Sequence, residues 1–288
     1  MFTQNLMKGT STCFFRSAEK EFLVDLNGKT SEVEVFKELK EAGIDCIELS
    51  FNYDRYINFM DFPNNAEKYA EYAKEAGITL FSIHLPFSQM HDISVTSEEQ
   101  RNTIISANEA IIKAAAGIGI KVAVLHPSSE PIEDSEREER KRLSREAIVY
   151  LKKVADEAGI TLAVENLPRT CLCNTSGEMI ELLNGTGVGV IFDTNHSLIE
   201  TNEVFIRNLT KAALRIVSLH ISDYDFTDEK HRLPGDGIND WKTIFAALEE
   251  NGYEGPLMYE VIKVPKGREQ VPFCDLAENM KKLANGQI

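Results

Sequence analysis

The chain has 288 residues, of which 43% are hydrophobic and 27% are charged, a composition typical of a globular protein with a sizeable core. Acidic residues outnumber basic ones by 46 to 31, and the formal charge of −15 argues against binding to nucleic acid or to an anionic membrane surface. We find no apolar run of about 20 residues, no N-terminal secretion signal and no C-x-x-C motif among the five cysteines, so we expect a cytoplasmic protein.

A recurring phrase marks the ends of the predicted helices. It reads EAGI, or a close variant, at 41–44, 75–78, 115–118, 157–160 and 250–253. Each copy predicts an amphipathic helix whose glycine takes the left-handed position after the last turn, followed at once by an apolar strand. Two helix starts, Ser31 with Glu34 and Thr175 with Glu178, have the spacing of a capping box.

Eight apolar runs of strand length alternate with these helices. The first lies within 6–15, and the others are 44–50, 78–85, 120–126, 160–166, 188–194, 215–221 and 256–262. This alternation predicts a parallel β/α architecture, and its even spacing shows no domain boundary. We therefore predict a single (β/α)8 TIM barrel domain over residues 1–288. The most charged run, 130–146, is expected to form the solvated outer face of the fourth helix.

Polar side chains stand at the ends of seven consecutive predicted strands. They are Glu48, His84, His126, Glu165, Asp193, His220 and Glu260. In a TIM barrel the carboxyl ends of the strands form the catalytic rim, so all seven are expected there. The remaining histidines, His91, His196 and His231, lie in loops that follow strands. We interpret His91 as structural.

Carboxylates that meet at one rim repel one another and raise their own pKa values unless a cation lies between them. The best set takes one residue from each of the last four strands: Glu165, Asp193, His220 and Glu260. This oxygen-rich set favours Mn²⁺, with Zn²⁺, Co²⁺ or Mg²⁺ as alternatives. A salt bridge to a loop arginine such as Arg169 or Arg232 explains one carboxylate well but four together less well.

Other metal-dependent barrels fit the order of residues poorly. An amidohydrolase carries His-x-His on its first strand, and an enolase-like site has a Lys-x-Lys strand, but neither pattern occurs at those places. A glycosidase carboxylate pair does not need three histidines at strand ends.

The polar motifs, taken in order, resemble those of the xylose isomerase-like TIM barrels. They are SIHLP, VLHP, AVEN, FDTNH, SLHISD, HRLPGDGINDW and YEV, and they run from residue 82 to residue 261. This superfamily contains sugar isomerases, ketose 3-epimerases, inosose dehydratases and endonuclease IV. The ordered set is specific for the superfamily rather than for one activity within it.

The resemblance implies that Glu165, Asp193, His220 and Glu260 bind a metal ion, and that Glu165 and Glu260 also move the proton of a sugar. Metal coordination to the sugar carbonyl and its neighbouring hydroxyl stabilises an enediolate. Return of the proton to the opposite face gives an epimer, whereas return to the neighbouring carbon gives an isomer. The residues expected to contact the substrate are Glu48, His84, His126, Arg169, His196, His231 and Arg232. Trp241 is expected to pack in the core.

The leading hypothesis is therefore a divalent-metal-dependent isomerase or epimerase of a sugar or sugar phosphate. A histidine at position 231 is also a point of resemblance to endonuclease IV. The further zinc ligands of that enzyme match His84, His126 and His196 here. Glu229 aligns with an aspartate of the family. The alternatives are an endonuclease IV-like multi-zinc phosphodiesterase, an inosose dehydratase-type lyase and a catalytically silent sugar-binding barrel. The sequence leaves open the substrate, the number of ions and whether the chain forms a homo-oligomer.

Overall fold

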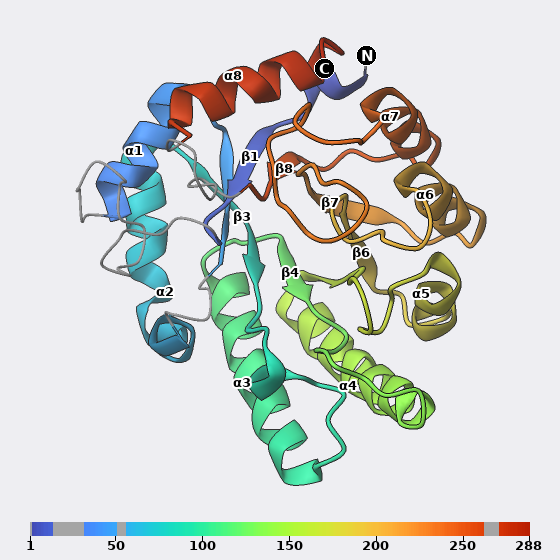
Figure 1. Ribbon diagram of the computed structural model, residues 1–288. Helices are drawn as coiled ribbons and strands as arrows, with labels where there is room; N and C mark the ends of the chain where they lie inside the picture. The colour runs from blue at the N-terminus through green and yellow to red at the C-terminus, as the bar shows by residue number, and fades with distance from the viewer. Residues whose placement is uncertain (1, 14–31, 51–55, 262–270) are drawn as a thin grey trace.

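Eight parallel strands form the centre of the computed structural model, and the helices surround them (Figure 1). The structure describes residues 2–13, 32–50, 56–261 and 271–288. The strands are β1 (Lys8–Ser11), β2 (Cys46–Leu49), β3 (Thr79–His84), β4 (Val122–Leu125), β5 (Thr161–Glu165), β6 (Gly189–Asp193), β7 (Ile216–His220) and β8 (Leu257–Tyr259). The helices are α1 (Glu32–Ala42), α2 (Tyr56–Ala76), α3 (Glu98–Gly117), α4 (Arg137–Ala158), α5 (Ser176–Leu183), α6 (Asn202–Lys211), α7 (Trp241–Glu250) and α8 (Phe273–Ala284), with short 3-10 helices η1 (Phe2–Asn5) and η3 (Gln89–His91).

The barrel closes between its first and last strands. Each strand from β1 to β7 pairs in parallel with its neighbour in sequence, and β1 also pairs with β8. Ile221, directly after β7, forms a bridge to Tyr259 of β8, and the Glu260 amide donates to the Ile221 carbonyl at 3.0 Å. The predicted (β/α)8 barrel is confirmed, and its closure brings the ends of β7 and β8 together.

The strands carry two separate apolar layers. A large cluster fills the space between strands and helices, and a smaller one of Val122, Val124, Ala163 and Ile191 fills the inside of the barrel. Because side chains two residues apart point to the same side of a strand, three of these inner apolar residues are each followed, two positions later, by an inner polar one. These pairs are Val124 with His126, Ala163 with Glu165, and Ile191 with Asp193.

The glycine turns after the helices follow the prediction with one exception. Gly43, Gly77, Gly159 and Gly252 have φ values of 97°, 68°, 77° and 72°. At 115–118 the predicted helix end is wrong: α3 continues through Gly117, and Gly119 takes the left-handed conformation with φ 86°. The Ile118 amide still donates to the Ala114 carbonyl, so the last helical bond extends past Gly117.

The predicted helix caps are borne out in part. Thr175 is the N-cap of α5 and accepts a hydrogen bond from the Glu178 amide at 3.3 Å. The reciprocal half of the capping box is replaced, since the Glu178 carboxylate accepts from the Cys173 amide at 2.8 Å and pairs with Arg137. Asp240 caps α7. Ser31, the other predicted cap, lies outside the described residues.

The charged run 130–146 is only partly a solvated face, which corrects the prediction. Arg140 of α4 is buried, and its guanidinium bonds to Asp92 and, at 2.9 Å, to Ser94. This arginine therefore ties the loop after β3 to α4. Within the described ranges, no helix combines the length and apolarity needed to cross a membrane.

Candidate metal centre

The polar residues at the strand ends meet inside one end of the barrel. Each of them is the last residue of its strand or the residue that directly follows the strand. They are His84, His126, Glu165, Asp193, His220 and Glu260. All are buried except His126, whose side chain is 20% exposed. The predicted convergence of these side chains is confirmed, because they form groups whose ligand atoms lie within 4.8 Å of one another.

The central cluster consists of Glu165, Asp193, His220 and Glu260. Nδ1 of His220 lies 2.9 Å from Oε1 of Glu165, 3.3 Å from Oε2 of Glu260 and 4.0 Å from Oδ2 of Asp193. These are the four residues expected to bind the metal ion. The structure thus brings the whole predicted ligand set together.

Two oxygen atoms of the central cluster fit a bound cation. Oε2 of Glu165 and Oδ2 of Asp193 are buried and have no hydrogen-bond donor in the described structure. Such an oxygen loses its hydration without gaining a hydrogen bond in return, which is costly for a carboxylate. A divalent ion supplies the missing partner, so the residues present suit a metal ion well.

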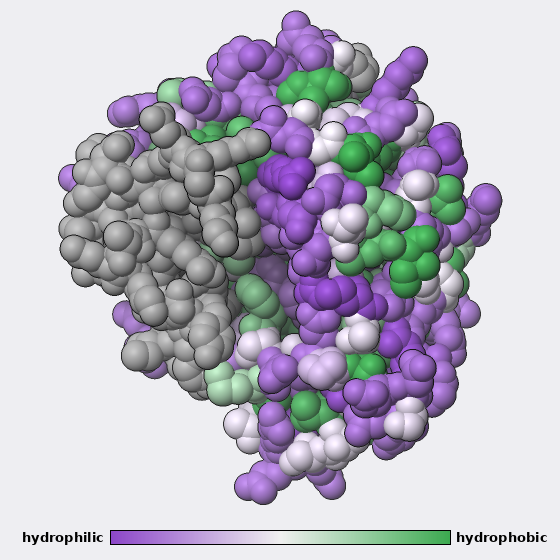
Figure 2. Space-filling view, in the orientation of Figure 1, coloured by the Kyte–Doolittle hydropathy of each residue, from purple (hydrophilic) through white to green (hydrophobic). Residues whose placement is uncertain are grey.

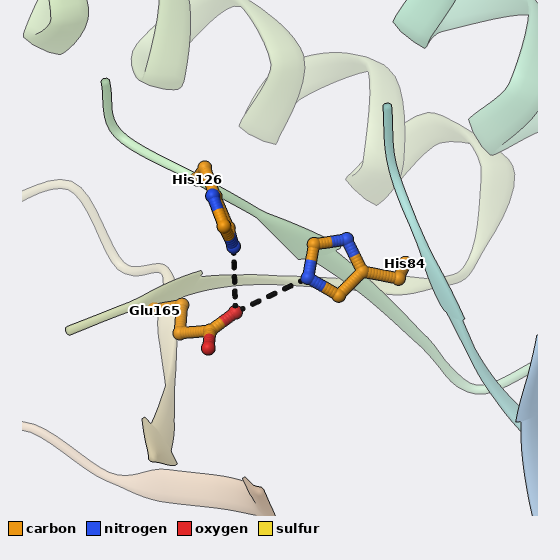
Figure 3. Close-up of side chains that lie close together, drawn as sticks. All are labelled: His84, His126 and Glu165. Atoms are coloured by element: carbon orange, nitrogen blue, oxygen red, sulfur yellow. Dashed lines mark ion pairs between the residues drawn. The ribbon is translucent and has the colours of Figure 1, made fainter. Parts of the chain in front are cut away.

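A second group, the β3–β4 cluster, consists of His84, His126 and Glu165 (Figure 3). Nε2 of His84 and Nε2 of His126 lie 3.3 Å and 3.2 Å from the same oxygen, Oε2 of Glu165. His84 donates its Nδ1 proton to the Leu85 carbonyl at 2.8 Å, since a carbonyl only accepts. In the neutral imidazole, the Nε2 lone pair therefore faces a carboxylate oxygen, an arrangement that a cation between them stabilises.

A third group, the loop cluster, consists of His196, Glu229 and His231. His196 donates its Nδ1 proton to the Asn166 carbonyl at 2.8 Å, and its Nε2 lies 2.8 Å from Oε1 of Glu229. His231 approaches the same oxygen with Nε2 at 3.9 Å. The three groups lie side by side, since Glu165 belongs to two of them and Nε2 of His196 is 3.3 Å from Oδ2 of Asp193.

The electrostatics of the metal-free clusters follow from burial and from the histidines. Burial raises the pKa of the Asp193 carboxyl to about 6, although His196 and His231 oppose this shift. Burial also acts to raise the pKa of Glu165, but His220 and His126 hold it well below its usual range. For His220 burial acts to lower the pKa, yet Glu165, Glu260 and Glu48 raise it well above its ordinary value. A proton on His220 thus compensates part of the negative charge.

A cavity of about 400 Å³ opens above the clusters. Its floor includes His84, His126, Glu165, His196, His231 and Glu260, and Phe87, Leu167 and Pro168 add an apolar wall. The Phe87 ring lies 4.5 Å from that of His84 and 4.9 Å from that of His126 between centroids. Figure 2 shows this face hollowed near its middle, with hydrophilic residues along the described side. Polar groups beside an apolar wall are typical of a small-molecule site.

Arg169 lies at the cavity but is already paired. Its Nε is 2.7 Å from Oε1 of Glu130, its Nη1 is 2.8 Å from Oδ1 of Asp228, and it also bonds to Glu229. It therefore links the loops after β4, β5 and β7. The predicted contact of Arg169 with a substrate stays a prediction.

Two further residues predicted to contact substrate lie elsewhere. Arg232 pairs with Asp225 at 3.3 Å and is absent from the residues that line the cavity in the described structure. Glu48 is fully buried on β2, beneath the cavity, where it contacts His220 and Ser82. The predicted contacts of Arg232 and Glu48 with the substrate stay predictions, and the positions of the two side chains argue against such contacts.

The loop that carries His231 is folded around Asp223. The Asp223 carboxylate accepts from the Gly235 and Asn239 amides and from the Trp241 indole at 2.9, 3.1 and 3.3 Å. A side chain at Gly237 would overlap Asp223, so this turn requires glycine. Trp241 is buried as predicted.

Several site residues have no counterpart in the sequence-based prediction. Phe87 and Cys13 line the cavity, and Glu130 holds Arg169 there. Cys13 is the last residue described after β1, a strand whose limits the apolar pattern did not define. Phe87 follows His84 by three residues, and this spacing was the one sign in the sequence that Phe87 lies near the site.

The family model of the xylose isomerase-like TIM barrel matches residues 36–283 of this chain. The chain belongs to this family. The predicted superfamily is thereby confirmed, and the clusters lie in the family's characteristic fold. The family contains proteins of several activities, so membership alone leaves the reaction open.

Two relatives of known activity match the chain over shorter stretches. An inosose isomerase from Bacillus velezensis is 27% identical over 177 residues, 58% of this chain and 62% of that protein. A ketose 3-epimerase from Arthrobacter globiformis is 35% identical over 124 residues, 41% of this chain and 40% of that protein. The matched part thus spans less than two thirds of either relative. The crystal structure of a D-tagatose 3-epimerase-like protein superposes with a TM-score of 0.77 at 19% identity and covers 98% of both chains, which supports the fold.

Proposed function

We propose that this chain is a divalent-metal-dependent isomerase or epimerase of a small sugar. One observation carries the proposal: of the four residues in the central cluster, only Glu165 and Glu260 also line the cavity. Asp193 and His220 lie beneath them, fully buried. Two carboxylates that can hold a cation and also reach the substrate suit a reaction in which a proton is removed and returned. The inosose isomerase and ketose 3-epimerase relatives support the same class.

The proposed ion is Mn²⁺, with Zn²⁺, Co²⁺ or Mg²⁺ as alternatives, held by Glu165, Asp193, His220 and Glu260. When bound, it acidifies the substrate C–H beside the carbonyl and stabilises the negative charge that develops on oxygen. Asp193 and His220 would serve only as ligands, because they do not reach the cavity. The two glutamates would serve as ligands and as proton carriers.

The proton moves between carbon and carboxylate. One glutamate takes the proton from the carbon next to the carbonyl, and the C–H electron pair stays with the substrate. The other glutamate donates a proton to the opposite face of that carbon, which gives the epimer. Donation to the neighbouring carbon gives the aldose or ketose isomer instead. Both carboxyl groups then regain their starting protonation through exchange with water.

The other cavity residues would orient the sugar. His84, His126, His196 and His231 present imidazole nitrogens to its hydroxyls, and Phe87 offers an apolar face to its C–H groups. Proximity of this kind matters because the reacting carbon must lie within reach of both carboxylates.

The experiment that tests the proposal compares Glu165→Gln and Glu260→Gln with the wild type. Epimer or isomer formation is followed by NMR across ketoses, their phosphates and inososes, with Mn²⁺ content measured on the same samples. We expect each variant to lose about 100-fold or more of its turnover, the usual contribution of a positioned acid or base. Glu249→Gln, an exposed substitution of the same kind on α7, should match the wild type. Wild-type turnover in either site variant would remove that glutamate from the mechanism.

An endonuclease IV-like phosphodiesterase is the second candidate function, because the β3–β4 and loop clusters offer two further groups of ligands. The formal charge of −15 opposes it, as do Glu130 and Glu229 at the cavity. Cleavage of DNA at abasic sites together with three bound zinc ions per chain would favour this candidate. A dehydratase is distinguished in the same NMR assay by a product that has lost water.

A further inference from the structure

His220 places its two ring nitrogens in different surroundings. Nδ1 lies 2.9 Å from Glu165 and 3.3 Å from Glu260, inside the central cluster. Nε2 points away from it and lies 3.0 Å from Oε1 of Glu48. A neutral imidazole has one N–H and one lone pair. The nitrogen among the other ligands must therefore offer the lone pair to a cation, and Nε2 must carry the proton.

Glu48 is held in place by contacts on both of its oxygens. Oε1 accepts from Nε2 of His220, and Oε2 accepts from the Ser82 hydroxyl at 2.8 Å. The carboxylate is fully buried between β2 and β3, and it lies outside both the cavity lining and the central cluster. The hydrogen bond to His220 is the direct contact of this buried carboxylate with the central cluster.

We propose that Glu48 is a positioning residue of the metal centre: it accepts the Nε2 proton of His220 and thereby aims Nδ1 at the cation. It does not contact the substrate. This inference rests on the proposed function, because it presumes a divalent ion in the central cluster. A carboxylate behind a ligating histidine fixes the tautomer and the ring plane, and it makes the imidazole a stronger donor.

The other histidines of the site support this assignment by contrast. His84, His196 and His231 each direct Nδ1 to a backbone carbonyl, at 2.8, 2.8 and 3.1 Å. The carbonyls belong to Leu85, Asn166 and Glu260. These neutral acceptors orient a ring but add little negative charge. His220, the one histidine of the central cluster, instead has a carboxylate partner, so its metal bond is the one that Glu48 strengthens.

The test measures metal affinity in Glu48→Gln, which keeps the shape of the side chain and removes its charge. Competition with a chromophoric chelator should show Mn²⁺ and Zn²⁺ affinity reduced by about 10- to 100-fold. At saturating metal, the KM for the sugar should stay at the wild-type value. Glu249→Gln is the matched control for loss of one carboxylate and should keep wild-type affinity. Unchanged metal affinity with a raised KM would overturn the proposal and return Glu48 to substrate binding.

A second variant keeps the inference testable if Glu48→Gln does not fold. Ser82→Ala removes one hydrogen bond from Glu48 and should lower metal affinity in the same direction, by a few-fold. Long-range ¹H–¹⁵N spectra of the zinc-loaded wild type should show the His220 proton on Nε2, and a proton on Nδ1 would refute the assignment. A wild-type chain that binds no divalent ion refutes the proposed function itself, an outcome distinct from unaltered affinity in the variants.

Discussion

Backbone carbonyls and one carboxylate orient the histidines at the end of the barrel. Three rings donate Nδ1–H to the main chain, which leaves each Nε2 facing a carboxylate of the clusters. His220 is reversed, with Nδ1 inward and Nε2 on Glu48. Each of these four rings thus has one nitrogen directed at a carboxylate, as the proposed metal centre requires. Such preorganised ligands bind metal ions more tightly than ligands that must first be ordered.

Metal binding should release a proton from His220. Its pKa is raised well above the ordinary value by Glu165, Glu260 and Glu48 against the effect of burial, which favours the protonated form of the metal-free ring. A cation must displace the Nδ1 proton, and apparent metal affinity should therefore fall as pH falls. Calorimetry in two buffers with different ionisation heats should detect about one proton released per ion at pH 7. A binding heat independent of the buffer would show that His220 is not a ligand.

Asp193 makes the stability of the metal-free fold depend on pH in the opposite direction: stability should fall as pH rises. Its pKa is raised from 3.8 to about 6 by burial, so the stability that it contributes is present below its unfolded pKa and is lost as pH rises towards 6. Asp193→Asn should reduce this decrease in the free energy of unfolding between pH 4 and about 6. Urea titrations of the wild type and of Asp193→Asn, in the presence of EDTA and at several pH values, measure this free energy. Identical pH profiles would contradict the assignment.

At the scale of elements, long-range ion pairs connect the loops to the helices. Arg140 of α4 reaches Asp92 after β3, and Arg169 after β5 reaches Glu130 and Asp228. These pairs join segments that the barrel places side by side at its carboxyl-terminal end. The loops that carry the site are therefore fastened to α4 and to each other.

Removing the buried arginine should destabilise the fold. Arg140→Ala leaves the Asp92 carboxylate, whose side chain is 3% exposed, without its cation. Loss of one partner of a buried ion pair typically costs about 3 kcal/mol or more of unfolding free energy. Arg142→Ala on the exposed face of the same helix is the control and should unfold at the wild-type urea concentration. Equal midpoints for the two variants would show that the Asp92 pair does not stabilise the barrel.

The sequence predicts the strands and the rim better than it predicts the contacts between loops. Apolar runs of strand length and glycine turns place Glu165, Asp193 and His220 at strand ends, and the structure confirms those positions. The partner of Glu48 lies 172 residues away, and Arg140 lies 48 residues from Asp92. Local periodicity contains no information about such pairs, so Glu48 was expected at the substrate and Arg140 at the solvated surface. The end of α3 was misplaced because two glycines stand two residues apart, at Gly117 and Gly119.

For the whole molecule, the central cluster concentrates negative charge inside a chain that is already acidic. The formal charge is −15, and three buried carboxylates share one end of the barrel. Self-repulsion of this kind destabilises the compact state, and a bound cation relieves it. We therefore expect folding stability to depend on metal occupancy.

A divalent ion should raise the melting temperature. At a free concentration 100 times the dissociation constant, binding to the native state alone adds about 2.7 kcal/mol. For a domain of this size, that corresponds to an increase of roughly 5 °C. Thermal melts with Mn²⁺ and with EDTA should show the difference, and Asp193→Asn should reduce it. No shift in the wild type would indicate that the cluster does not hold an ion.

The measurement that tests the central claim most directly is deuterium transfer from solvent to substrate. The chain is incubated in D₂O with a panel of ketoses and inososes, with Mn²⁺ or with EDTA, and the carbon next to the carbonyl is followed by NMR. The account predicts deuterium at that carbon in the Mn²⁺ samples and none with EDTA, with Glu165→Gln and Glu260→Gln both inactive. Product formed without deuterium uptake, or exchange that persists in EDTA, would contradict metal-dependent proton transfer by these two glutamates.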